Sequence, residues 1–210
     1  MESSLKNMII VMLGITLVCS AAVGGVYTLT FDTIEQAKAQ KLNEAYGEVL
    51  PEFETLESNT VELAGEQMKV NVATMGQTVV GYAVESSANG FGGAIRMVVG
   101  FDAEGTVTGV KVLEQAETPG LGDLISKPNS KVERSIVGRN PGQIKMAVTK
   151  DGGDVDALTA ATITSRAYVN AVDKAFNAYL IKVKGADAAD GYSGATTQVK
   201  TDAEKGGNNE

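Results

Sequence analysis

A hydroxyl-rich segment, Asp156-Ala157-Leu158-Thr159-Ala160-Ala161-Thr162-Ile163-Thr164-Ser165, stands immediately before a stretch with the apolar spacing of a helix. The first turn of a helix has free backbone N–H groups, and the helix dipole favours negative charge there. The small side chains of Ala160 and Ala161 allow a bulky group to approach the backbone. The segment therefore suits an anionic group. The alternative is a threonine that only caps the helix, stabilising it by about 1 kcal/mol.

Three further glycine-bearing loops are candidates for ligand contacts, although each by itself predicts only a turn. They are Asn89–Ala94, Glu117–Asp123 and Asp151–Asp154. Neither of the first two has the third glycine of a dinucleotide fingerprint, because Ile95 and Ile125 occupy that position, and the chain has no Gly-Lys-Ser/Thr sequence. The usual nucleotide-binding loops are therefore excluded.

The composition excludes several kinds of chemistry. The chain of 210 residues has no histidine and a single cysteine, Cys19. It therefore has no Ser–His or Cys–His catalytic pair, intrachain disulfide, thiolate zinc site or protein-ligated iron–sulfur cluster. The net charge of −8 argues against nucleic acid as a partner. Any redox chemistry must belong to a bound organic cofactor.

An uncharged apolar run from Met8 to Leu29 predicts a transmembrane helix. A helix of this length extends about 33 Å, enough for a bilayer core of about 30 Å. The alternative is a cleaved signal peptide, with small residues from Ser20 to Ala22 near a cleavage point. Lys6 precedes the run, while Asp32 and Glu35 follow it, which favours a cytoplasmic N-terminus and an exported domain.

The residues after this run predict an α+β fold. Asp32 and Glu35 have capping-box spacing, which predicts a helical stretch that ends at Leu50, before Pro51. This helix either begins at Asp32 or continues from the membrane span as a stalk. Alternating patterns predict strands at 68–72, 79–84, 95–101, 106–113 and 144–148, with a hairpin turn at 102–105. A helix is expected over about 164–183, with a single apolar stripe formed by Val169, Val172, Phe176, Tyr179, Leu180 and Val183.

Taken together, Asp151–Arg166, Glu117–Gly122 and Asn89–Ala94 resemble segments of the covalent flavin-binding domain in the G subunit of the Rnf electron-transport complex. The sodium-pumping NADH:quinone reductase has a similar domain in its C subunit. With the N-terminal span, the motifs occur in order and cover nearly the whole chain except the tail. Gly122-Asp123 and the compact length look more like the Rnf version.

The resemblance implies an electron-transfer subunit carrying flavin mononucleotide (FMN). In this family a flavin transferase esterifies the FMN phosphate to the last threonine of an Asp-x-x-Ser/Thr-Gly-Ala-Thr motif, which is Thr162 here. The implied partners are the flavin transferase and other membrane subunits of the complex. The implied cofactor-binding residues are Gly93, Glu117, Thr118, Pro119, Gly120, Leu121, Gly122, Thr159, Ala161, Thr162, Ile163 and Thr164.

Two features depart from the motif. Ala160 replaces its usual glycine, and the extra methyl is compatible with the motif only if the backbone at Ala160 keeps φ below zero. The tail segment Asp190–Thr196 matches the motif more closely, but it has low-complexity surroundings and no following apolar helix. Thr162 is therefore the expected site, and Thr196 is a chance match or a second flavin site.

Charged residues near these motifs have alternative interpretations. Glu114 and Glu117 form either a paired-carboxylate site or, more simply, a solvated strand end. Lys145, Lys150 and Arg166 either approach the flavin phosphate or carry surface charge.

The expected organisation has five parts. They are a cytoplasmic N-terminus (1–7), a transmembrane helix (8–30), a stalk and linker (31–60), a single FMN-binding domain of antiparallel strands with packing helices (61–184) and a disordered polar tail (185–210). The expected location is the bacterial inner membrane, with one span and the domain on the periplasmic side. Competing interpretations are the C subunit of a quinone reductase and a membrane-anchored scaffold that has lost its flavin. A redox sensor is a third, but no signalling domain is visible.

Overall fold

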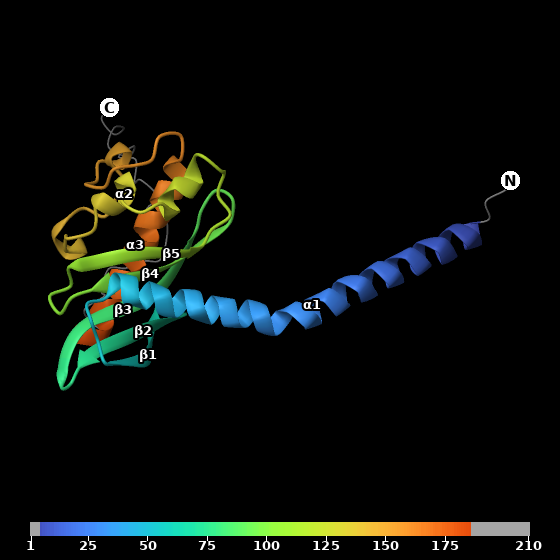
Figure 1. Cartoon of the computed structure of the whole chain (residues 1–210). Coiled ribbons are helices and arrows are strands. Elements are labelled where there is room, and N and C mark those ends of the chain that lie inside the picture. Colours follow the sequence, from blue (N-terminus) through green and yellow to red (C-terminus); the bar gives the residue numbers. More distant parts are fainter. Residues whose placement is uncertain (1–4, 186–210) are drawn as a thin grey trace, which may run out of the picture. The chain divides into compact units, whose positions relative to one another are not determined.

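The computed structural model describes residues 5–185, so Thr196 and the rest of the predicted tail lie outside the described residues. The chain separates into two units, with the boundary between Glu44 and Ala45. The first unit consists of most of a long helix, and the second contains the sheet (Figure 1).

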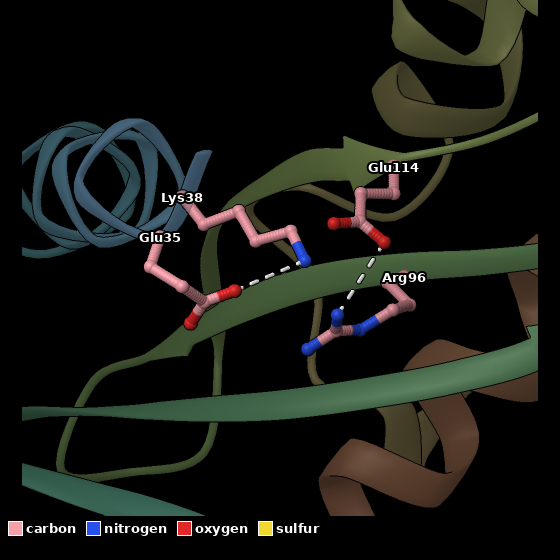
Figure 2. A network of polar contacts seen from close by, with 4 residues as sticks. All are labelled: Glu35, Lys38, Arg96 and Glu114. Carbon is pink, nitrogen blue, oxygen red and sulfur yellow. Dashed lines mark hydrogen bonds and ion pairs between the residues drawn. The ribbon is translucent and has the colours of Figure 1, made fainter. Parts of the chain in front are cut away.

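Helix α1 extends from Leu5 to Val49. Its most apolar 18-residue window has a mean hydropathy of 2.4 and no buried residue, so the helix is long and apolar enough to cross a membrane. The helix passes through Asp32 without interruption, so it continues from the apolar run and does not begin at Asp32. Glu35 instead pairs with Lys38 one turn later, at 3.4 Å (Figure 2).

Five antiparallel strands form one sheet in sequence order (Figure 1). They are β1 (Thr55–Leu63), β2 (Glu66–Met75), β3 (Thr78–Asn89), β4 (Ala94–Phe101) and β5 (Val107–Glu114). The predictions for β2 to β5 and for the hairpin at 102–105 are confirmed, although β2 and β3 are longer than predicted. Strand β1 was missed because it is an edge strand whose residues, except Leu63, are exposed or only partly buried, so its sequence has few apolar residues.

Helix α3 (Thr162–Lys184) packs across one face of this sheet, chiefly against β3. Small side chains along its buried face, including Ala171 and Ala175, allow close approach, and the Ser86 hydroxyl on β3 donates to the Ala171 carbonyl at 2.7 Å. The ring of Phe101 on β4 stacks on Tyr179, with centroids 5.1 Å apart. The predicted apolar stripe is confirmed except at Val183, which is 40% exposed.

The opposite face of the sheet receives the last turn of α1, which belongs to the same unit as the sheet. Tyr46 is buried there and donates from its hydroxyl to Glu85 at 2.9 Å, while the Asn71 amide donates to the Tyr46 oxygen at 3.0 Å. Burial, and secondarily the nearby Glu85 carboxylate, raise the pKa of Tyr46 well above its ordinary value, so the phenol stays a donor. These bonds join the end of the helix to β2 and β3.

Gly100 and Gly109 make room for the end of α1. A Cβ at Gly100 would come within 2.1 Å of the Val49 carbonyl oxygen, which also accepts a hydrogen bond from the Thr108 hydroxyl.

The cross-strand ion pair of Arg96 and Glu114 lies on the surface, with an N–O distance of 3.4 Å (Figure 2). Both side chains are about half exposed, so the pair contributes little to stability.

The segment between β5 and α3 consists of short turns and loops. It contains 3₁₀ turns at Gly122–Ser126, Pro141–Gln143 and Thr149–Asp151, and one turn of helix, α2 (Lys131–Arg134). The strand predicted at 144–148 is wrong, since only Val148 forms a bridge, with Val155. Some of its other backbone groups have local partners instead; the Lys145 N–H, for example, donates to the Asp154 carboxylate at 2.7 Å.

Two residues before α3, Ala160 has a φ of +60°. The condition set from the sequence, a negative φ at this position, is therefore not met. The left-handed conformation costs an alanine roughly 1–2 kcal/mol, whereas glycine adopts it freely. Ala160 thus occupies a position whose backbone conformation favours glycine.

We expect Ala160→Gly to raise the free energy of unfolding by about 1 kcal/mol, because it removes this backbone cost. Denaturant unfolding of the full chain in detergent measures the change. Ala161→Gly is the matched control, since Ala161 is buried with a φ of −131°, and it should lower stability. A stability loss in Ala160→Gly would contradict the assignment.

Gly100→Ala should destabilise the sheet domain by roughly 1–3 kcal/mol, because its methyl would overlap the Val49 carbonyl. Gly47→Ala is the control, since a Cβ at this exposed helical glycine meets nothing within 4 Å, and it should stabilise by about 0.5–1 kcal/mol. Thermal unfolding of both variants tests whether the end of α1 is docked as described; equal stabilities would refute it.

Candidate functional site

A cavity of about 470 Å³ opens between the first turn of α3 and two loops that were singled out from the sequence. Ten residues line it: Phe91, Glu117, Thr118, Leu121, Gly122, Ala160, Ala161, Thr162, Ile163 and Thr164. Three segments far apart in the sequence therefore meet at one place. The volume is in the range of small-molecule and cofactor pockets, about 300–1,000 Å³.

The side chain of Glu117 connects these three segments. It is only 5% exposed, and one carboxylate oxygen accepts the Gly92 N–H at 2.9 Å while the other accepts the Thr164 hydroxyl in a short hydrogen bond. Hydrogen bonds from two donors offset the free-energy cost of removing this carboxylate from water. Glu117 thus links its own loop to the 89–93 loop and to α3.

This placement decides between the two interpretations of Glu114 and Glu117. Glu114 is exposed and pairs with Arg96, so the solvated strand end is confirmed for Glu114. That interpretation is wrong for Glu117, whose carboxylate faces inward. The sequence could not separate them, because both are glutamates at the end of one strand.

Gly122 is required at the cavity by packing against this carboxylate. A Cβ at Gly122 would come within 2.8 Å of the Glu117 Cβ and 2.9 Å of the Thr164 hydroxyl oxygen. Gly120 has nothing within 4 Å but has a φ of +76°, so it is required by backbone conformation. Glycine is therefore required at Gly122 and Gly120 for different physical reasons.

The hydroxyls at the start of α3 are not equivalent. Thr164 is buried and donates to Glu117, and the Ser165 hydroxyl donates to the Ala161 carbonyl while accepting the Leu158 N–H. Thr162 is half-buried, lines the cavity, and accepts a hydrogen bond from the Lys150 ammonium at 2.9 Å. Both threonines line the cavity, but the Thr164 hydroxyl donates to Glu117, whereas the Thr162 hydroxyl accepts its hydrogen bond and donates to no acceptor among residues 5–185.

The alternative of a simple threonine cap is wrong. The residue at the N-cap position of α3 is Ala161, and no side chain caps the helix there. The first-turn N–H groups are thus free of the side-chain acceptor that a capping threonine would supply.

Arg166 does not extend toward Thr162 but forms a two-pronged ion pair with Asp151, at 2.8 and 2.7 Å. The hydrogen bond from Arg166, with the charges of Arg166 and Lys150, lowers the pKa of the Asp151 carboxyl. This pair ties the loop at 149–153 to the first turn of α3. The charge of Arg166 is balanced by Asp151, whereas Lys150 is the cation that contacts Thr162.

Most of the residues predicted for the site line the cavity, but not all. Thr159, Pro119, Gly120 and Gly93 are not among the lining residues. Phe91 was not predicted, although it lines the cavity and is 70% exposed. An exposed aromatic side chain between glycines was the signal that could have identified it.

Three apolar side chains line the cavity and are partly exposed. Phe91, Leu121 and Ile163 are 70%, 42% and 50% exposed, respectively. Within residues 5–185, no cluster of His, Cys, Asp or Glu side chains could hold a metal ion. The arrangement suits an organic group with a flat apolar part and a polar end near Thr162.

Comparison with known proteins gives a consistent result. Residues 90–177 match the FMN-binding domain family. The chain is also similar to proteins named as the G subunit of an ion-translocating oxidoreductase complex. That of Shewanella baltica is 35% identical over 76% of this chain and 82% of its own length. That of Cronobacter sakazakii is 36% identical over 77% and 86%, and that of Haemophilus influenzae 37% over 74% and 81%.

The fold also resembles a solved structure. The C subunit of the Na⁺-translocating NADH-quinone reductase of Parabacteroides distasonis superimposes with a TM-score of 0.51 over 69% of this chain and 83% of that one, at 24% sequence identity. This similarity concerns the fold, and it confirms the predicted α+β domain. The sequence relatives cover most of both chains at more than 30% identity. The chain therefore belongs to the family formed by the G subunits of ion-translocating oxidoreductase complexes.

Proposed function

We propose that this chain is the membrane-anchored electron-transfer subunit of an Rnf-type ion-translocating oxidoreductase complex, with FMN linked through a phosphoester to Thr162. The single observation that carries the attachment site is the position of the Thr162 hydroxyl. It lies at the cavity, it is half-buried, and its hydrogen-bond partner is a cation.

The shape and polarity of the cavity support FMN as the ligand. Its apolar rim of Phe91, Leu121 and Ile163 offers contacts to a flat ring system. The start of α3 also lines it, and there free N–H groups and the helix dipole favour a phosphate. FMN has both parts, an apolar ring and an anionic phosphate, and when bound it supplies the electron-carrying chemistry that this chain's side chains lack.

The protein's own residues position and surround the ligand. Glu117 fixes the separation between the 117–122 loop and α3, so the cavity keeps its width. Leu121 and Ile163 exclude water from part of the opening, and loss of water changes the relative stability of charged and neutral forms of a bound group. No side chain here needs to act as an acid or base.

The resemblance also supports Thr162 over the other threonines. Thr164 has its hydroxyl committed to Glu117, and Thr159 does not line the cavity. The condition of a negative φ at Ala160 is not met, so the support for Thr162 comes from its place at the cavity and not from the match at Ala160. Maturation then requires a flavin transferase as a partner.

The anchor and the orientation complete the proposal. The apolar part of α1 lies in the inner membrane, with Lys6 on the cytoplasmic side and Asp32 on the other. The sheet domain then lies outside the cytoplasm. Electrons reach and leave it through other subunits of the complex, and a single span does not by itself form an ion pathway.

Thr162→Ala should abolish covalent flavin in a chain co-expressed with a flavin transferase, because the esterified oxygen is removed. Intact mass of the purified chain, and flavin fluorescence in a denaturing gel, measure the loss. Thr159→Ala and Thr196→Ala are the matched controls, and both should retain one FMN.

Each alternative gives a different mass. Undiminished flavin in Thr162→Ala would refute the assignment, and two flavins per wild-type chain would place a second one on another residue. A wild-type chain of unaltered mass would support the flavin-free scaffold.

A fusion of alkaline phosphatase to the C-terminus should be active, because this enzyme matures only outside the cytoplasm, where its disulfides form. The double variant Lys6→Glu, Asp32→Lys moves the positive charge from the N-terminal to the C-terminal end of the span. It should lower the phosphatase activity, because the charge then favours a cytoplasmic domain. An inactive fusion to the unmodified chain would place the domain in the cytoplasm.

A further inference from the structure

The ammonium of Lys150 is the charged group in contact with Thr162. Its Nζ lies 2.9 Å from the Thr162 Oγ1. Lysine has only donors, so the hydroxyl oxygen accepts this bond and its own hydrogen stays available to another acceptor. Among residues 5–185, Lys150 forms no ion pair with a carboxylate, although the Asp151 carboxylate is near enough to feel its charge.

The loop that carries Lys150 is held by several contacts. The neighbouring Asp151 is bound by both prongs of Arg166, which extends from the first turn of α3. A Cβ at Gly153 would come within 2.0 Å of the Ala147 carbonyl oxygen, so the chain packs against itself there. Gly152 ends the 3₁₀ turn with a φ of +73°. The backbone of Lys150 is therefore placed by its neighbours.

Lys145 lies close by in the same loop and serves as a comparison. Its backbone N–H donates to Asp154, and its Nζ lies 3.7 Å from the position of a Cβ on Gly152, on the loop rather than on Thr162. Lys145 and Lys150 carry the same charge on the same short loop. Of the two, Lys150 contacts the hydroxyl.

We propose that Lys150 is a positioning residue for the modification of Thr162. It orients the hydroxyl and stabilises the negative charge that develops on its oxygen, and it then pairs with the phosphodiester after attachment. This proposal rests on the proposed function, since it concerns the same threonine. It goes further by naming the side chain that makes this threonine, rather than another, accept a flavin phosphate.

The chemical step is balanced without any change of oxidation state. A bond forms between the Thr162 oxygen and the phosphorus of an activated flavin phosphate, a mixed anhydride such as a flavin dinucleotide. The anhydride P–O bond breaks, and the nucleotide remainder leaves. The Thr162 proton goes to a base of the modifying enzyme or to water, and Lys150 keeps its own protons. A preorganised donor at a developing oxyanion accelerates such a step.

The arrangement also assigns a role to the Asp151–Arg166 pair. If Lys150 were held only by its flexible side chain, it would sample many positions. The ion pair fixes the adjacent residue to the helix that carries Thr162, so Lys150 and Thr162 lie on two segments that are joined beside them. Asp151 therefore acts on Thr162 through Lys150.

The test uses the full chain in detergent with a flavin transferase and flavin dinucleotide, and follows covalent flavin by intact mass over time. Lys150→Gln should slow incorporation about tenfold, less than the roughly 10²–10³-fold lost with a water-excluded oxyanion donor, because Lys150 is exposed. Lys150→Arg should recover most of the rate, and Lys145→Gln should match the wild type. Melting temperatures of all variants should agree, because Lys150 is exposed.

Two further measurements separate positioning from a general structural effect. In fully loaded protein, the phosphorus NMR shift of the phosphodiester should change in Lys150→Gln and not in Lys145→Gln. Asp151→Asn should slow incorporation in the wild-type background but not in the Lys150→Gln background, as expected if Asp151 acts through Lys150.

The outcomes distinguish the two proposals. Equal rates for Lys150→Gln and Lys145→Gln, with flavin still on Thr162, would overturn the role of Lys150 and leave the proposed function standing. Flavin that persists in Thr162→Ala would overturn both. A slow Lys150→Gln with an unchanged phosphorus signal would overturn the contact with the attached phosphate.

Discussion

The candidate site depends on one buried carboxylate. The Glu117 carboxylate accepts hydrogen bonds from the Gly92 N–H and the Thr164 hydroxyl, and so joins three segments that are distant in the sequence. A charge in this position is tolerable only when both oxygens have donors, so the segments and the carboxylate stabilise each other. The cavity beside it exists because these contacts hold the loop at 117–122 against the start of α3.

Because of this contact, the hydroxyls of Thr162 and Thr164 have different hydrogen-bond partners. Two residues apart on one helical turn, they face in different directions, and only Thr164 reaches Glu117. Thr162 turns toward Lys150 and the cavity. A motif with several hydroxyls thus contains one that joins the helix to Glu117 and one that contacts Lys150 beside the cavity, and the division follows from the helix geometry.

The sheet positions this turn from both sides. Helix α3 lies against β3 and β4 through alanines and an aromatic cluster, which sets the direction in which its first turn points. On the other face, the last turn of α1 is joined to β2 and β3 through Tyr46 and its two partners. A domain fastened in this way to the end of a long apolar helix suits a redox carrier that must stay near membrane partners.

The sequence by itself determined the elements whose pattern is local. The apolar run, strands β2 to β5 and helix α3 follow from hydropathy and periodicity, and the resemblance singled out Thr162. Tertiary structure alone decided the rest. Edge strand β1 buries too little to show a pattern, and the positive φ of Ala160 arises where a loop meets a helix. The inward turn of Glu117 and the contact of Lys150 with Thr162 join residues 47 and 12 positions apart, and no local pattern encodes such pairings.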